Sequence, residues 1–168
     1  EIGFHVPPEV AVEGVGPKEM AEAVHRAAAA AIDRGGGRFL LTLGGEHSVS
    51  PGVVRAFAER REGLSVLHLD AHADLRDDYE GERHSHACAC RRIRDHVATT
   101  VSVGVRSLSE EEARLVRMEG IPLYWARDVV GHEGWIDEAV ERLSDEVYLT
   151  IDLDVLDRLA LQVAEATA

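Results

Sequence analysis

Three short clusters of histidine and carboxylate side chains carry the chemistry of this sequence. They are Gly44–Ser48, which contains His47, Asp70–Asp74, which has His72 at its centre, and Asp152–Asp154. Each cluster stands where an apolar, strand-like run ends. Imidazole nitrogens and carboxylate oxygens in this number form a ligand set for two adjacent divalent metal ions. The first hypothesis is therefore a metal-dependent hydrolase.

Two of the aspartates are candidates for bridging a metal pair. Metal ions about 3.5 to 4 Å apart need a shared anion, which screens the repulsion between them. Asp70 and Asp152 each follow a strand-like run and are the natural bridges. The other ligands would be His47, His72, Asp74 and Asp154. This oxygen-rich set with two imidazoles suits Mn²⁺ better than a metal that prefers thiolates.

Each cluster also has a simpler interpretation. His47, after two glycines, is about as well explained by a turn or a helix cap. Asp70–Asp74 could be a solvated loop. Asp152 and Asp154 are harder to explain in this way, because they interrupt an apolar strand in which unpaired carboxylates are costly to bury.

The elements that must position these clusters alternate between helices and strands. The patterns predict helices at Pro17–Arg34, Pro51–Arg61, Ser109 to about Gly120 and Trp135–Leu143, with His86–His96 also compatible with a helix. They predict strands at Phe39–Leu43, Leu64–Leu69, Thr99–Val105, Pro122–Trp125 and Val147–Leu153. This alternation favours an α/β fold with three αβα layers and a mostly parallel sheet of at least five strands. Ligands of such sheets bind beyond the carboxyl ends of the strands, where all three clusters lie.

Composition limits the classes of function. The chain has 168 residues, 45% of them hydrophobic, which is enough for one domain. A net charge of -13 argues against nucleic acid as a partner and is compatible with a cationic substrate. The sequence has no apolar run of the roughly 20 residues that span a membrane, and no signal peptide is visible. Cys88 and Cys90 are too closely spaced for a usual zinc site and are interpreted as small apolar helix residues. We therefore expect a cytoplasmic protein.

Three segments resemble the signature segments of the ureohydrolase family, which includes arginase, agmatinase, guanidinobutyrase and formimidoylglutamase. They are Gly44–Val49, His68–Asp74 and Thr150–Asp157. The segment Tyr79–Ala87 looks most like agmatinases and their close relatives. The resemblance covers nearly the whole chain up to Asp157, and it implies an arginase-like version of the α/β fold.

The resemblance also implies a site with two Mn²⁺ ions. One ion would be held by His47, Asp70, Asp74 and Asp152, and the other by His72, Asp70, Asp152 and Asp154. Asp74 would in addition orient the attacking water, and His86 would be the proton shuttle that helps protonate the leaving amine. Without the resemblance, His86 would be interpreted as a surface histidine beside His84.

By resemblance, the activity is Mn²⁺-dependent hydrolysis of a linear guanidino compound. Agmatine is the first candidate for this small cationic substrate and would give urea and putrescine, a step of polyamine biosynthesis. Guanidinobutyrate, formimidoylglutamate and arginine remain alternatives, as does a metal-binding but inactive homologue. A metallophosphatase is compatible with two metals, but no Arg or Lys cluster near the ligands favours it. The family commonly forms trimers or hexamers, so a homo-oligomer is expected.

The pattern departs from the family after Asp157. Relatives continue with a Gly/Pro-rich loop, further strands and a late acidic residue that grips the guanidinium. Here Arg158–Ala168 follows directly, with the pattern of a closing helix. We therefore expect a single ureohydrolase domain over residues 1–168 that lacks an interior segment near 157/158. The proposed metal ligands would be present, and the guanidinium-binding carboxylate would not.

Overall fold

A parallel β-sheet forms the centre of the molecule. The structure is a computed structural model and describes residues 5–11, 13–131 and 133–156. The sheet has the order β3-β2-β1-β4. Its strands are β1 (Ser65–Leu69), β2 (Thr99–Val105), β3 (Leu123–Trp125) and β4 (Val147–Ile151). All neighbouring strands are parallel, so their carboxyl ends lie at one edge of the sheet.

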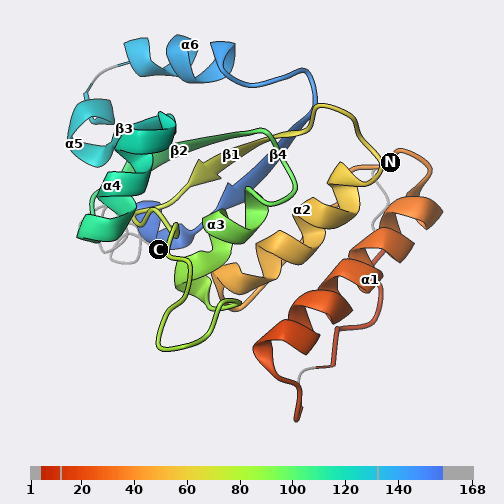
Figure 1. The fold of residues 1–168 in the computed structure, drawn as a ribbon. Helices are drawn as coiled ribbons and strands as arrows, with labels where there is room; N and C mark the ends of the chain where they lie inside the picture. The colour runs from red at the N-terminus through yellow and green to blue at the C-terminus, as the bar shows by residue number, and fades with distance from the viewer. Residues whose placement is uncertain (1–4, 12, 132, 157–168) are drawn as a thin grey trace, which may run out of the picture.

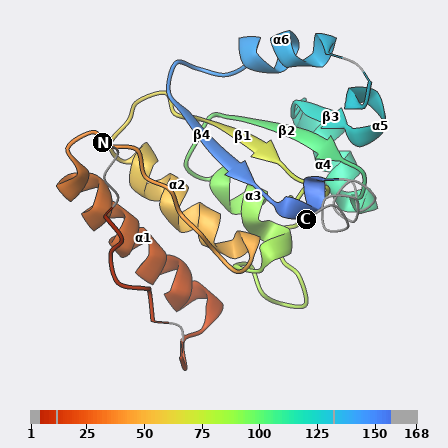
Figure 2. The ribbon, with the colours of Figure 1, turned by 180° about the vertical axis from the view of Figure 1, so that it is seen from behind.

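Helices cover both faces of this sheet (Figures 1 and 2). On one face lie α2 (Ser50–Ala58) and α3 (Ala89–Ile93), with α1 (Pro17–Gly35) packed outside α2. On the other face lie α5 (Ala126–Val129) and α6 (Gly134–Glu141), and α4 (Glu110–Glu119) packs beside β3. The chain also forms short 3-10 helices, which are η1 (His47–Val49), η2 (His86–Cys88) and η3 (Leu153–Val155). The three-layer α/β prediction is confirmed.

The core is divided by the sheet because alternate strand residues face opposite sides. Val66 of β1 packs against Val54 of α2 and Ile93 of α3. On the opposite face, Leu67 packs in the cluster that contains Ala139 of α6. Across the part of the chain that the structure describes, no helix is both long and apolar enough to cross a membrane.

One predicted strand is wrong. Phe39–Leu43 has no strand structure, and Phe39, Leu41 and Leu43 are 92%, 70% and 87% exposed. An apolar run becomes a strand only where another strand supplies backbone hydrogen bonds, and among the described residues the sheet ends at β4. The described sheet therefore has four strands and not the five or more expected. The helix expected at Arg158–Ala168 lies outside the described residues.

The contact between α1 and α2 depends on Gly52. A Cβ atom at Gly52 would lie 2.6 Å from the carbonyl oxygen of Ala21 and 3.0 Å from the backbone nitrogen of His25. Because these are backbone atoms of α1, Gly52→Ala should push the helices apart and lower the free energy of unfolding by about 1 to 3 kcal/mol. Chemical denaturation would measure this change.

The matched control is Gly134→Ala at the start of α6, where an added Cβ meets nothing within 4 Å. Alanine should leave stability there unchanged or raise it by up to about 1 kcal/mol. Equal stability changes in the two variants would contradict the close approach at Gly52.

Candidate metal centre

The sheet brings two of the carboxylate clusters together. Leu69 at the end of β1 pairs with Ile151 at the end of β4. The next residue along each strand is an aspartate, Asp70 or Asp152, so the two aspartates leave the sheet side by side. A hydrogen bond of 2.9 Å from the Asp152 backbone nitrogen to the Leu69 carbonyl oxygen continues the pairing up to this point. Parallel topology alone therefore places both aspartates at the same edge.

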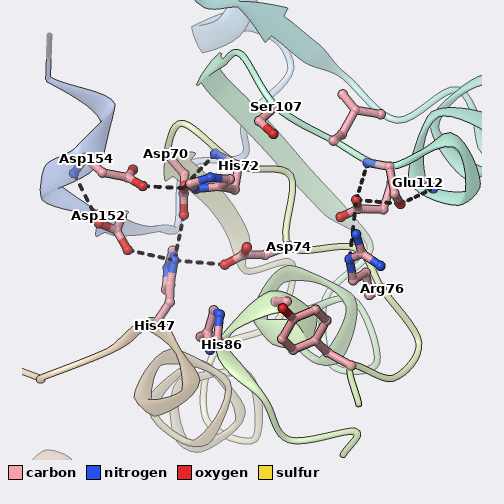
Figure 3. Close-up of a pocket in the computed structure, with 14 residues that line it drawn as sticks. His47, Asp70, His72, Asp74, Arg76, His86, Ser107, Glu112, Asp152 and Asp154 are labelled. Atoms are coloured by element: carbon pink, nitrogen blue, oxygen red, sulfur yellow. Dashed lines mark hydrogen bonds and ion pairs between the residues drawn. The ribbon is translucent and has the colours of Figure 1, made fainter. Parts of the chain in front are cut away.

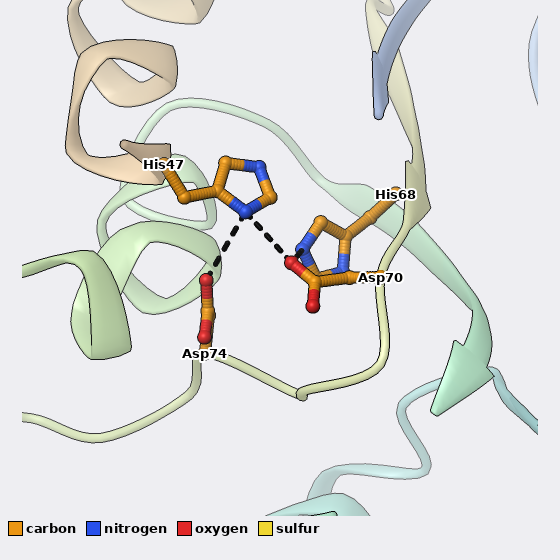
Figure 4. A group of neighbouring side chains, drawn as sticks. All are labelled: His47, His68, Asp70 and Asp74. Atoms are coloured by element: carbon orange, nitrogen blue, oxygen red, sulfur yellow. Dashed lines mark hydrogen bonds and ion pairs between the residues drawn. The ribbon is translucent and has the colours of Figure 1, made fainter. Parts of the chain in front are cut away.

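The first cluster surrounds the imidazole of His47, in the turn before α2 (Figure 4). His47 Nδ1 lies 2.7 Å from an oxygen of Asp70, 3.2 Å from one of Asp74 and 3.8 Å from one of Asp152. His47 Nε2 lies 3.0 Å from the hydroxyl oxygen of Thr150, which fixes the ring. His47, Asp70 and Asp74 are all buried.

The second cluster consists of Asp70, His72 and Asp154 and is more open. His72 Nδ1 lies 2.9 Å from Asp154 Oδ2 and 3.6 Å from Asp70 Oδ1. The side chain of His72 is 55% exposed, whereas that of Asp70 is 1% exposed. The side chain of Asp154 is held in place because its Oδ1 accepts the backbone N–H of Ala71 at 3.1 Å. Asp70 is shared by both clusters.

Burial and charge act together on the first cluster. Burial alone would lower the pKa of His47, but the hydrogen bonds and charges of Asp70 and Asp74 outweigh it and raise that pKa to about 10. Burial raises the pKa of Asp70, but the hydrogen bond from His47 and the neighbouring imidazole of His68 reverse this and hold that pKa well below its usual range. Burial raises the pKa of Asp74, and the charge of Asp70 adds to it against the hydrogen bond from His47.

This arrangement fits a pair of divalent cations. Carboxylate oxygens converge on Nδ1 of His47, so in the charged form the imidazolium proton supplies the positive charge that these buried anions need. A cation at that point would meet one imidazole nitrogen and several carboxylate oxygens, the donors that Mn²⁺ accepts. The second cluster offers the same donor types around the shared Asp70.

A cavity of about 410 Å³ opens over both clusters (Figure 3). The predicted residues that line it are His47, Asp70, His72, Asp74, His86, Asp152 and Asp154. His86 begins η2, and its ring lies 5.7 Å from that of Tyr79, centre to centre. The structure therefore brings all the predicted site residues to one pocket, and their roles there stay a prediction.

The sequence analysis missed several residues at or beside this site, among them His68, Arg76 and Glu112. His68 is fully buried, its ring lies tilted by 32° against that of His47 with ring centres 4.9 Å apart, and its Nε2 lies 3.1 Å from Asp70 Oδ2. A histidine inside an apolar strand, two positions before Asp70 and hence on the same side, was the available signal. Arg76, two positions after Asp74, and Glu112 also line the cavity, and only tertiary structure brings Glu112 there.

The fold and the pocket define a class: an α/β protein with a cluster of imidazoles and carboxylates beyond the carboxyl ends of a parallel sheet. Comparison with known proteins places it further, because the family model described as the arginase family matches residues 4–162. The chain belongs to the arginase family.

Similar proteins come from several organisms. The chain is 41% identical over 123 residues to an N(1)-aminopropylagmatine ureohydrolase of Synechocystis, covering 72% of this chain and 40% of the relative. It is 40% identical over 124 residues to an agmatinase of Bacillus anthracis, covering 72% and 41%. The crystal structure of agmatine ureohydrolase of Thermoplasma volcanium superposes with a TM-score of 0.75 at 30% identity, covering 86% of this chain and 48% of that one. The matches to the two curated relatives thus span about 40% of their length.

Proposed function

We propose that the protein is a Mn²⁺-dependent ureohydrolase that releases urea from a linear guanidino compound, with agmatine as the first candidate and putrescine as the second product. The observation that carries this proposal is the position of Asp70, shared between two clusters of potential ligands at the floor of one cavity. The names of the relatives, agmatinase and aminopropylagmatine ureohydrolase, support the same substrate class. The choice of Mn²⁺ rests on the resemblance and on the oxygen-rich donor set.

Each proposed ligand has a place in this scheme. His47 and Asp74 would hold one ion, His72 and Asp154 the other, and Asp70 and Asp152 would bridge them. When bound, the pair of ions would supply a nucleophilic water at neutral pH by lowering its pKa. This assignment starts from the two groups of residues whose potential ligand atoms lie close together in the structure, and it adds Asp152 to them.

Two residues would move or hold protons. The Asp74 carboxylate, buried beside His47, would accept a hydrogen bond from the attacking water and so orient it. His86, exposed in the wall of the cavity, would deliver a proton to the leaving amine nitrogen. A cationic substrate agrees with the acidic cavity floor and with the net charge of -13.

The test is urea release by the Mn²⁺-loaded chain with agmatine, N(1)-aminopropylagmatine, arginine and guanidinobutyrate in parallel. Urea from agmatine above the others is the expected result. Urea from one of the other three would move the proposal to that substrate. Bound metal without urea from any substrate would favour a metal-binding, non-catalytic role, the second candidate.

His86→Ala should lower kcat about 100-fold, because the leaving amine loses its proton donor, while the content of bound Mn²⁺ stays unchanged. Steady-state kinetics and metal analysis on the same preparation measure both quantities. His84→Ala is the matched control, since this half-buried histidine is two positions away and does not line the cavity. Loss of metal from His86→Ala would refute the assigned role.

A further inference from the structure

We infer that Glu112 is a positioning residue for the candidate metal centre, because its carboxylate holds the peptide after Asp74 in the conformation that aims Asp74 at His47. The inference rests on the proposed metal site. Glu112 belongs to α4, far along the chain from the proposed ligands, and it is only 4% exposed. Its side chain faces the same cavity as Asp74 (Figure 3).

Both oxygens of the Glu112 carboxylate are occupied by the protein. Oε1 accepts the backbone N–H of Leu75 at 2.9 Å. Oε2 accepts the backbone N–H of Ser109 at 2.7 Å and its hydroxyl at 2.8 Å. The Arg76 guanidinium, 4.0 Å away, offsets the buried charge. Because both of its oxygens already accept hydrogen bonds from the protein, this carboxylate holds the chain in place and is not available to bind the guanidinium of the substrate.

The contact with Leu75 fixes one peptide unit from both sides. The carbonyl oxygen of Asp74 accepts the backbone N–H of Arg91 at 2.9 Å, and the N–H of the same peptide belongs to Leu75 and points to Glu112. This peptide unit follows Asp74, whose φ of +52° lies in a region that is uncommon for residues other than glycine. Such a conformation persists only where the surroundings determine it. Here the hydrogen bonds to Glu112 in α4 and to Arg91 in α3 hold this conformation.

A second contact anchors the same loop at its start. The backbone nitrogens of Arg106 and Ser107 donate to the Ala71 carbonyl oxygen at 2.8 and 3.1 Å. The segment between β2 and α4 is thus joined to the ligand loop at Ala71 and, through Glu112, at Leu75. Asp74 lies between these anchors, so removing the Glu112 contact frees the end of the loop that carries it.

The test is Mn²⁺ binding by calorimetry in the full chain with Glu112→Gln, which keeps the side-chain volume. A glutamine amide has only one oxygen acceptor, so it cannot receive the Leu75 and Ser109 donors together. We expect the Mn²⁺ affinity of the site that contains His47 and Asp74 to fall about 10-fold, the scale found for partners that orient metal ligands. Amide hydrogen exchange at Leu75 should become faster in the same variant.

Two controls separate this role from simple helix capping. Glu111→Gln changes the exposed neighbour on the same helix and should leave metal affinity unchanged. Ser109→Ala removes the cap hydroxyl of α4 but leaves the Leu75 contact, so it should lower the unfolding temperature with metal affinity retained. Equal affinity in Glu112→Gln and Glu111→Gln, or equal loss in Ser109→Ala, overturns the inference. Absence of Mn²⁺ binding by the unaltered chain would instead overturn the proposed function itself.

Discussion

Asp70→Ala should weaken binding of both proposed metal ions, whereas loss of His47 or His72, each of which belongs to one cluster, should spare an ion. The reason is that Asp70 is the residue common to the two groups of potential ligands. Its Oδ2 lies 2.7 Å from His47 Nδ1, and its Oδ1 lies 3.6 Å from His72 Nδ1. Because partners that merely orient a ligand cost 10-fold or more, loss of this shared ligand should weaken both sites by more than about 100-fold. Metal content after dialysis against micromolar Mn²⁺ measures the effect.

The control for this change is Asp145→Ala, which removes an exposed carboxylate from the loop before β4. That variant should keep the full metal content. Asp70→Asn addresses the risk that a buried alanine disturbs folding, since asparagine keeps the size of the side chain. If Asp70→Asn folds, by circular dichroism, and still holds two ions, the shared role of Asp70 is wrong.

Local signals were sufficient for most of the fold. The Ser109 cap and the acidic residues after it predicted the start of α4, and the structure has a capping box between Ser109 and Glu112. The strand prediction at Thr99–Val105 matches β2 residue for residue. Phe39–Leu43 failed because its apolar pattern carries no information about whether a partner strand lies alongside. Periodicity reports which side chains avoid water, and pairing depends on the rest of the sheet.

The site, like the fold, could be predicted from the sequence only in part. Asp70 and Asp152 could be placed together from the sequence because parallel strands bring their carboxyl ends to one edge. Glu112 could not, since its contact with Leu75 crosses 37 positions and depends on how α4 meets the loop after β1. Sequence patterns therefore located the donors of the candidate centre, and tertiary structure revealed the groups that orient them.

The two clusters also differ in how tightly they should hold an ion. His47 is 7% exposed and lies among buried carboxylates, whereas the side chain of His72 is 55% exposed. A chelator reaches an open ligand more readily, and an ion between buried anions gains more from their charge because water screens it less. The ion proposed for the site with His72 should therefore leave first.

His47→Ala and His72→Ala should each bind about one Mn²⁺ per chain, but with opposite lability. In His72→Ala the remaining ion should resist EDTA, since it sits with Asp70 and Asp74 in the buried cluster. In His47→Ala the remaining ion should be lost at low chelator concentration, and the proposed urea release should fail in both variants because the proposed two-metal reaction needs the pair. Titration of each variant with EDTA, followed by metal analysis, shows which variant loses its ion at the lower chelator concentration. Because each variant removes one imidazole, each serves as the control for the other. Equal resistance of the two variants to EDTA would contradict the prediction that the buried site holds its ion more tightly than the exposed site.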